Sequence, residues 1–304
     1  MNNHRYTLEP YNGMKTRYKC PNCDKARQFT RYIDTQTNEY LNDAVGVCSR
    51  LIKCGYHYKP KQYFQENNIL FVKTKSEPYT KRTPQPKPTT SFINAEVMQE
   101  SLISNNPNLF IDFLTNIWDE EIANYLKVKY NIGTSRYWKG ATTFWMQDIK
   151  GNIRSGKIML YNPANGKRVK KPYNHINWEH KTRNLENFNL EQCYFGEHLL
   201  NEDKSKPVAI CESEKTAIIS SVYLPEFIWL ACGSLNNLNE AKTKALKGRN
   251  AVLFPDLKCF DLWNDKIPKL TSLATFRTST LLEVKATAEE KEKGLDIADY
   301  LLKI

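Results

Sequence analysis

Two close cysteine pairs near the start of the chain are the residues whose types and spacing indicate chemistry most directly. Cys20 and Cys23 enclose two residues, and Cys48 and Cys54 enclose five. Each pair can hold one edge of a metal ion from a tight turn, and two pairs complete the tetrahedral thiolate site that zinc prefers. The spacing therefore predicts a zinc site made by Cys20, Cys23, Cys48 and Cys54.

The fourth ligand is open at this stage, because Cys54-Gly-Tyr-His57 offers both a thiol and an imidazole. His57 could replace Cys54 or support a ligand from outside the first shell. Buried thiols without a metal are the remaining alternative for the four cysteines. The other cysteines stand singly among apolar residues, which is typical of reduced, buried thiols; they are Cys193, Cys211, Cys232 and Cys259.

Positive charge is concentrated near the cysteine pairs. Residues 1–90 hold 16 Lys and Arg against 7 Asp and Glu, whereas the other 214 residues hold 28 against 26. A localised basic field attracts polyanions, so the charge and the zinc pattern together predict nucleic acid as the partner, with solubility as the alternative role. The expected phosphate contacts here are Arg27, Arg31 and Lys53. Tyr32 or Tyr56 is expected to stack on bases.

A second basic stretch lies farther along the chain. Residues 149–178 contain no acidic side chain, but they contain seven basic ones. We expect Arg154 and Lys157 to contact phosphate from this stretch. A solvated surface without a partner is the alternative.

Two acidic residues follow strand-like runs in the last third of the chain. Glu212 comes directly after 207–211, and Asp256 comes after 251–254. In open α/β sheets, ligands bind at the carboxyl ends of the strands, where carboxylates from two strands can hold a magnesium ion. Such an ion stabilises phosphate oxygens during phosphoryl transfer. The alternative is that each residue only caps a helix.

The elements that would position these acids alternate regularly. Expected strands are 207–211, 227–231, 251–254 and 281–284, and expected helices are 213–223, 237–246, 261–270 and 296–302. This alternation predicts a compact α/β domain with a mostly parallel sheet.

The preceding residues predict a different organisation. A zinc β-ribbon is expected over 11–66, a Pro/Lys-rich linker over 74–92, and a helical plus β-meander region over 93–200. Asn106-Pro107 predicts a helix start, and a second helix is expected from Asp119. The predicted fold class is therefore α+β and multidomain, ending in the α/β domain.

Residues 205–304 resemble the Toprim domains of primases and topoisomerases. Four pieces carry the likeness in order: Val208-Ala-Ile-Cys-Glu-Ser-Glu-Lys-Thr-Ala217, Leu230-Ala-Cys-Gly-Ser234, Val252-Leu-Phe-Pro-Asp256 and Gly294-Leu-Asp-Ile-Ala-Asp-Tyr-Leu-Leu302. The resemblance implies that Glu212 is the glutamate of the first motif and that Asp256 opens the Asp-x-Asp metal motif. It makes Glu212 and Asp256 the expected catalytic residues.

The whole chain resembles primase-like proteins of Bacteroidetes mobile elements, a family labelled as a domain of unknown function. The likeness rests on Cys20-Pro-Asn-Cys, Cys54-Gly-Tyr-His, Thr143-Phe-Trp, Gly156-Lys-Ile-Met, Phe195-Gly-Glu-His-Leu-Leu and Glu212-Ser-Glu-Lys-Thr. It implies a primase-like nucleotidyltransferase that uses magnesium or manganese, with single-stranded DNA and replication or mobilisation proteins of the element as partners.

The sequence departs from the Toprim pattern at Lys258, where the second aspartate of Asp-x-Asp would stand. A lysine ammonium could pair with Asp256 and replace the ion in part. Asp261 is the candidate substitute ligand. Three functions stay open: metal-dependent primer synthesis, DNA binding without catalysis, and Toprim nuclease activity.

No signal peptide or membrane span is visible in the sequence. The first residues have no apolar core segment, and no apolar run approaches the length of a membrane-spanning helix. We therefore expect a cytoplasmic protein without a membrane partner.

Overall fold

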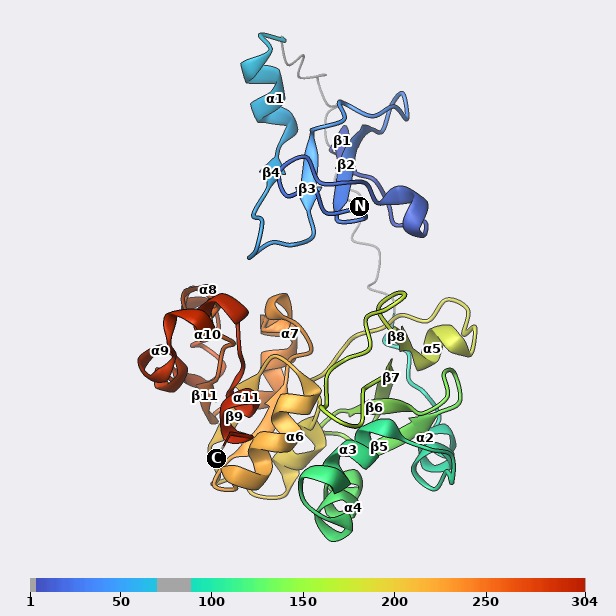
Figure 1. The fold of residues 1–304 in the computed structure, drawn as a ribbon, viewed down its shortest axis with the longest axis vertical. Helices are drawn as coiled ribbons and strands as arrows, with labels where there is room; N and C mark the ends of the chain where they lie inside the picture. The colour runs from blue at the N-terminus through green and yellow to red at the C-terminus, as the bar shows by residue number, and fades with distance from the viewer. Residues whose placement is uncertain (1–3, 70–88, 304) are drawn as a thin grey trace. The chain divides into compact units, whose positions relative to one another are not determined.

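The computed structural model describes residues 4–69 and 89–303 (Figure 1). The chain divides into two compact units, Met1–Pro86 and Lys87–Ile304, called here the amino-terminal and carboxyl-terminal units. Most of the linker expected over 74–92 lies outside the described residues, which resume at residue 89.

The amino-terminal unit is a small antiparallel sheet followed by one helix. Its strands pair in chain order, and they are β1 (Tyr6–Leu8), β2 (Phe29–Asp34), β3 (Gly46–Cys48) and β4 (His57–Tyr58). A 3-10 turn η1 (Met14–Thr16) precedes β2, and α1 (Pro60–Glu66) follows β4. Its small core contains Cys20, Phe29 and Cys48, all fully buried. So few apolar side chains stabilise a fold weakly, and a metal at the cysteines would contribute much of the folding energy.

Three helices open the described part of the carboxyl-terminal unit: α2 (Ala95–Leu102), α3 (Leu109–Ile117) and α4 (Glu120–Lys129). Asp119 caps α4 by accepting a hydrogen bond from the Ile122 amide, at the predicted position. The prediction of Asn106 as the cap of α3 is wrong by two residues. Asn108 is the cap, and its side chain accepts hydrogen bonds from the amides of Phe110 and Ile111.

An antiparallel meander follows the helices. Its strands are β5 (Ile132–Ser135), β6 (Ala141–Gln147), β7 (Ile153–Met159) and β8 (Ile176–Trp178), paired in that order. The short helices α5 (Glu179–Thr182) and η2 (Glu197–Asn201) lead away from it.

A four-stranded parallel sheet ends the fold, in the order β10-β9-β11-β12. The strands are β9 (Val208–Cys211), β10 (Ile228–Ala231), β11 (Asn250–Leu253) and β12 (Thr275–Thr278). The connecting helices are α6 (Glu214–Tyr223), η3 (Leu235–Asn237), α7 (Glu240–Thr243), η4 (Lys244–Leu246), α8 (Phe260–Asn264), η5 (Ile267–Lys269), α9 (Leu281–Lys285), α10 (Ala288–Lys293) and α11 (Ile297–Leu301).

The expected strand at 281–284 is wrong, because those residues form helix α9. A short apolar run cannot be assigned to strand or helix from periodicity alone. The true fourth strand, β12, lies at the sheet edge and has only half-buried or exposed residues, so its sequence carries little apolar signal.

The meander and the parallel sheet share one hydrophobic core. Phe110, Phe144 and Tyr161 belong to the same buried cluster as Ile210 and Trp229. Figure 1 shows the green meander strands and the orange to red α/β part side by side within this unit. The regions expected at 93–200 and 205–304 therefore fold as one unit.

Within residues 4–69 and 89–303, no helix combines the length and the apolar character required to cross a membrane.

Candidate functional site

The four amino-terminal cysteines converge. Their sulfur atoms all lie within 4.8 Å of one another, with 3.7 Å between the Sγ atoms of Cys20 and Cys54 and 4.0 Å between those of Cys23 and Cys48. Four ligands at a Zn–S distance of about 2.3 Å define a tetrahedron with edges of about 3.8 Å. The cluster therefore has the ligand set and the size that zinc requires.

Local structure brings the four thiols to one point. Cys20 and Cys23 lie on the turn before β2, Cys48 ends β3, and Cys54 closes a turn that starts near Arg50. His57 lies outside the cluster, with its Nε2 atom 3.0 Å from the hydroxyl of Tyr32. The structure thus favours Cys54 over His57 as the fourth ligand.

The surroundings of the cysteines change the pKa values of their thiols in opposite directions. The Asn22 side-chain amide donates to Cys54 Sγ at 3.5 Å and is the main cause of a Cys54 pKa lowered to about 6. Burial raises the pKa of Cys48 to about 12. Because zinc binds thiolates, metal binding must release the proton of Cys48, and the affinity for zinc must rise with pH.

The three predicted phosphate contacts of the amino-terminal unit fall into two groups. Arg31 is engaged within the fold: its Nη1 lies 2.9 Å from Asp43 Oδ1, and its guanidinium stacks 4.0 Å from the Tyr18 ring. Arg27 and Lys53 are exposed and form no ion pair within the described residues. Only these two of the three predicted contacts are therefore free to meet a phosphate without breaking an ion pair.

The two aromatic candidates on this unit also differ. The Tyr56 hydroxyl donates to the Ala44 carbonyl at 3.0 Å, and its ring packs against buried Phe29. The ring of Tyr32 is half-buried and stacks on the exposed ring of His57. Tyr32 is therefore the better placed of the two to meet a base.

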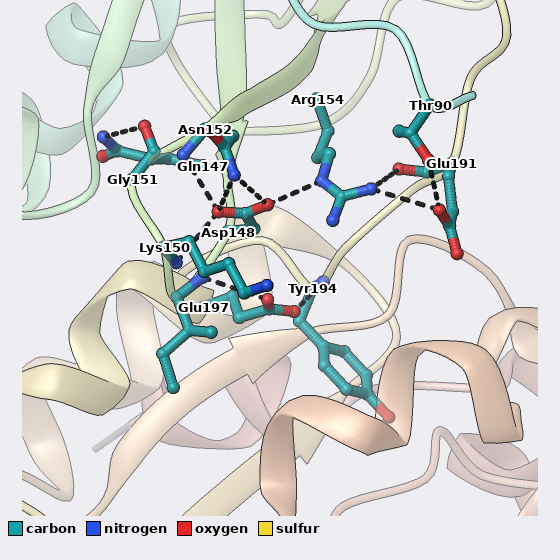
Figure 2. A network of polar contacts seen from close by, with 11 residues as sticks. Thr90, Gln147, Asp148, Lys150, Gly151, Asn152, Arg154, Glu191, Tyr194 and Glu197 are labelled. Atoms are coloured by element: carbon teal, nitrogen blue, oxygen red, sulfur yellow. Dashed lines mark hydrogen bonds and ion pairs between the residues drawn. The ribbon is translucent and has the colours of Figure 1, made fainter.

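Arg154 is held in a polar network in the carboxyl-terminal unit (Figure 2). Its Nε donates to Asp148 Oδ2 at 2.8 Å, and its Nη1 lies 3.4 Å from Glu191 Oε2. Asp148 is buried and also accepts from Asn152 and from the Lys150 amide. The prediction that Arg154 contacts phosphate is not supported, because its guanidinium forms ion pairs with Asp148 and Glu191, which lie outside the basic stretch.

Lys157, the other predicted contact in the meander, is buried. Its Nζ lies 2.9 Å and 3.1 Å from the two carboxylate oxygens of Glu214 and 3.4 Å from the Gly233 carbonyl oxygen. Gly233 turns the chain after β10 with φ of +86°, a conformation that glycine adopts without strain. Lys157 therefore joins the meander to the parallel sheet, and it is not a surface cation.

Glu212 and Asp256, called here the acidic pair, lie at the carboxyl ends of neighbouring strands. Glu212 follows β9 and Asp256 follows β11. The chain runs from β9 to β10 on one side and then returns across β9 to β11, so β9 and β11 flank the topological switch point of the sheet. Open α/β sheets form their ligand sites at this position.

The negative charges of the acidic pair are poorly balanced by neighbouring groups. Both side chains are half-buried, and neither carboxylate has a hydrogen bond or ion pair among the described residues. Burial raises the pKa of Asp256 well above its usual value, and the negative charges of Asp296 and Glu212 add to the effect. Burial also raises the pKa of Glu212, although Arg168 and Lys157 oppose the shift. This site has a surplus of negative charge that a cation would relieve.

Glu212 and Asp256 do not by themselves form a complete set of ligands for a metal ion. Among the described residues, only the four cysteines form a group of three or more metal-binding side chains. Asp261 is exposed on α8 and does not complete a group with the acidic pair. Magnesium, however, commonly binds through one or two carboxylates, keeps several waters, and takes further oxygens from substrate phosphates. The acidic pair fits that kind of site.

Lys258 does not neutralise the acidic pair by an ion pair. Its Nζ lies 3.0 Å from Glu292 Oε2 in α10, so the expected pairing with Asp256 is not formed. Lys258 has φ of +74°, which is uncommon for a residue with a side chain. The loop after β11 thus directs the Lys258 ammonium toward α10 instead of into an ion pair with Asp256.

Two neighbours of the acidic pair could not be recognised from the sequence patterns. Asp296 caps α11, and its Oδ2 accepts from Thr216 Oγ1 at 2.6 Å. Arg168 lies in the connection between β7 and β8 and lowers the pKa of Glu212. Asp296 was visible only as part of a helix motif, and Arg168 only as one cation among several.

A separate polar cleft of 410 Å³ lies elsewhere on this unit. It is bordered by α2, the turn after β5 and α5, and it shares no residue with the acidic pair. Its walls include Arg136 and Arg183 together with Glu100 and Glu179. The mixture of both charges gives this cleft no clear preference for an anion or a cation.

Comparison with family models finds two matches. Residues 4–69 match a family described as a zinc beta-ribbon finger, which together with the cysteine cluster confirms the predicted zinc ribbon. Residues 108–257 match a domain of unknown function (DUF6371). Comparison with curated proteins gives no match.

Solved primase structures show a distant likeness. The primase fragment of the bacteriophage T7 primase-helicase protein is 11% identical over 92% of this chain and 98% of its own, with a TM-score of 0.36. The RNA polymerase domain of Mycobacterium tuberculosis primase DnaG is 11% identical over 66% and 80%, with a TM-score of 0.40. The zinc-binding and RNA polymerase domains of Aquifex aeolicus primase are 10% identical over 98% and 83%, with a TM-score of 0.34. With TM-scores below 0.5, these likenesses carry no argument about this chain.

Proposed function

We propose that this chain is a primase-like, nucleic-acid-binding protein that performs metal-dependent nucleotidyl transfer on single-stranded DNA. The observation that carries the proposal is the acidic pair: two carboxylates that lie at the switch point of a parallel sheet and have no hydrogen-bond or ion-pair partner within residues 4–69 and 89–303. The Toprim-like motifs of residues 205–304 support the same assignment, since they give Glu212 and Asp256 metal-binding roles.

In this proposal, the acidic pair holds a magnesium or manganese ion together with the phosphates of a nucleotide. Bound there, the ion would supply charge stabilisation for the oxygens of the transferred phosphoryl group. Glu212 and Asp256 position the ion, and Arg168 adds a positive charge near Glu212. No third acidic side chain is required, because substrate oxygens and water complete the coordination.

The zinc ribbon has the second role, which is to hold the template. Arg27 and Lys53 offer exposed charges that form no ion pair in the described part of the chain, and Tyr32 offers a half-buried ring. Single-stranded DNA is bound by this combination of backbone charge and stacking. The resemblance to primase-like proteins of mobile elements adds replication or mobilisation proteins of such an element as proposed partners.

Primer synthesis on a single-stranded template, with magnesium or manganese, tests the catalytic part. The wild-type protein should extend nucleotides into short primers, and Glu212→Gln should abolish synthesis while DNA binding persists. Glu226→Gln, which removes an exposed acid of the same unit, serves as the control and should remain active. Absence of synthesis in the wild-type protein would refute nucleotidyl transfer, and strand cleavage that depends on Glu212 would instead identify a nuclease.

DNA binding without catalysis is the second candidate, and two ion pairs favour it. Lys157 forms an ion pair with Glu214. Lys258, which pairs with Glu292, stands where the second aspartate of the metal motif is expected. In that case DNA affinity should fall steeply with salt, by about 0.7 decade per decade of salt for each phosphate neutralised. Lys258→Asp separates the two candidates. If Lys258 has disabled the site, the aspartate should create manganese binding that the wild-type protein lacks; affinity insensitive to salt would refute the DNA-binding role.

A further inference from the structure

Four aromatic side chains gather on the surface of the carboxyl-terminal unit, outside its hydrophobic clusters. Tyr137 and Trp138 lie in the turn between β5 and β6, and Tyr173 and His175 lie in the connection between β7 and β8. We call these four residues the ring cluster. Two loops about 35 residues apart in sequence thus bring their aromatic residues to one place.

The ring cluster is a connected set with two open faces. The rings of Tyr173 and His175 stack with centroids 4.5 Å apart, and Trp138 meets His175 edge-on at 5.1 Å. Tyr137 packs edge-on against Trp138 at 4.5 Å. Tyr137 is 50% exposed and Tyr173 is 53% exposed, and neither phenol has a hydrogen bond in the described structure. These two rings are therefore available to a ligand.

Basic side chains accompany the rings in the sequence, and the segments that carry them contain no acidic residue. Arg136 and Lys139 flank the first aromatic pair, and Lys167 and Lys171 precede the second. All four are exposed, and none forms an ion pair within the described residues. Residues 122–147 and 149–178 contain no Asp or Glu. Arg136 and Tyr137 also line the polar cleft that contains Glu100 and Glu179. The positive charge that accompanies the rings therefore comes mainly from Lys139, Lys167 and Lys171, which form no ion pair among the described residues.

This chemistry fits a single strand of nucleic acid. Unpaired bases stack on aromatic faces, and the phosphates between them require cations at short intervals. A duplex would offer the cations its phosphates but would keep its base faces covered. An apolar protein partner would leave Arg136, Lys139, Lys167 and Lys171 without counter-charges.

We infer that the ring cluster and its cations form a second binding surface for single-stranded DNA, which holds the template on the same unit as the acidic pair. The inference rests on the proposed function and adds the residues that hold the strand. The connection that carries Tyr173 and His175 also carries Arg168, whose charge acts on Glu212. A hydrogen bond between His175 Nδ1 and the Val169 carbonyl fixes this connection. A strand stacked on the ring cluster would thus lie on the same loop as Arg168.

Binding of fluorescein-labelled oligo-dT to the full, zinc-loaded chain tests this surface by fluorescence anisotropy. Tyr173→Ala and Tyr137→Ala should each weaken binding by about 5-fold or more, since one stacked base contributes about 1–3 kcal/mol. Tyr173→Phe keeps the ring and should bind as the wild type does. Tyr125→Ala is the matched control, because Tyr125 is 58% exposed on α4, outside the ring cluster.

A second arm uses a strand of equal length that lacks bases. Stacking predicts that the wild-type protein binds this abasic strand more weakly and that the deficit of Tyr173→Ala disappears on it. A deficit that persists on the abasic strand would mean that the substitution acts on the fold, and it would overturn the inference.

The outcomes separate this inference from the proposed function. If the wild-type protein binds DNA but both alanine variants bind equally well, the ring cluster is refuted and the proposed function stands. If the wild-type protein binds no single-stranded DNA, both fail. Tighter binding of an RNA strand that depends on the same tyrosines would overturn the assignment to DNA.

Discussion

Replacing Lys157 tests whether this lysine is structural or contacts nucleic acid. Its side chain is 10% exposed, that of Glu214 is 3% exposed, and the closest N–O distance is 2.9 Å. Lys157→Met keeps the aliphatic length and leaves Glu214 buried without its cation. Breaking a buried ion pair from one side costs about 3–5 kcal/mol. We expect unfolding free energy to fall by about 3–5 kcal/mol.

The assay can isolate the carboxyl-terminal unit, because all six tryptophans lie between Trp118 and Trp263. Tryptophan fluorescence during urea unfolding therefore reports on this unit alone. The double variant Lys157→Met with Glu214→Gln removes both charges, and it should lose much less stability than the two single losses added together. Lys150→Met, at an exposed lysine of the same meander, should change stability by less than about 0.5 kcal/mol.

One result would refute this reasoning. If Lys157→Met lost less than about 1 kcal/mol while weakening DNA binding, Lys157 would be a phosphate contact, as the sequence predicted. A stability loss in the double variant equal to the sum of the two single losses would show that the lysine and Glu214 are not coupled.

Three further predictions concern the cysteine cluster and the network of Figure 2. Chelation of zinc should unfold the amino-terminal unit, seen as lost far-ultraviolet circular dichroism, while the tryptophan transition stays unchanged; a fold that survives chelation would contradict this. Cys54→Ser should reduce bound zinc, measured by atomic absorption, whereas His57→Gln should not; the reverse result would make His57 the ligand. Burial raises the pKa of Asp148, but hydrogen bonds from Asn152 and Arg154 lower it by a larger amount. The pKa of Asp148 in the folded state therefore lies below its unfolded value. The stability it contributes is present above about pH 4 and is lost as pH falls through the folded pKa. Asp148→Asn should therefore cost about 2–3 kcal/mol at pH 7 and progressively less in acid, measured by urea unfolding; a deficit independent of pH would contradict the assignment.

Local patterns in the sequence predicted the zinc ribbon and most strands of the parallel sheet. Cysteine spacing fixes a metal site because the ligands come from two tight turns. The strands β9, β10 and β11 are fully or mostly buried, so each appears as an apolar run. Edge strand β12 is not buried in this way, and the sequence placed a strand at α9 instead.

Pairings between distant residues could not be predicted in the same way. Lys157 and Arg154 stand in a stretch without acids, yet Glu214 and Glu191 reach them from other segments. Charge counted along the chain therefore overestimated the free positive surface of the meander. The ring cluster was missed for the same reason, since its members come from two loops that only the fold brings together.

Manganese binding to the acidic pair tests the central claim most directly. Titration of manganese into the zinc-loaded chain with single-stranded DNA and nucleotide, followed by electron paramagnetic resonance, should show one bound ion per chain. Glu212→Gln and Asp256→Asn should each remove it, and Asp261→Asn should leave it in place. The account is contradicted if the wild-type protein binds no manganese, or if binding persists in both variants of the acidic pair.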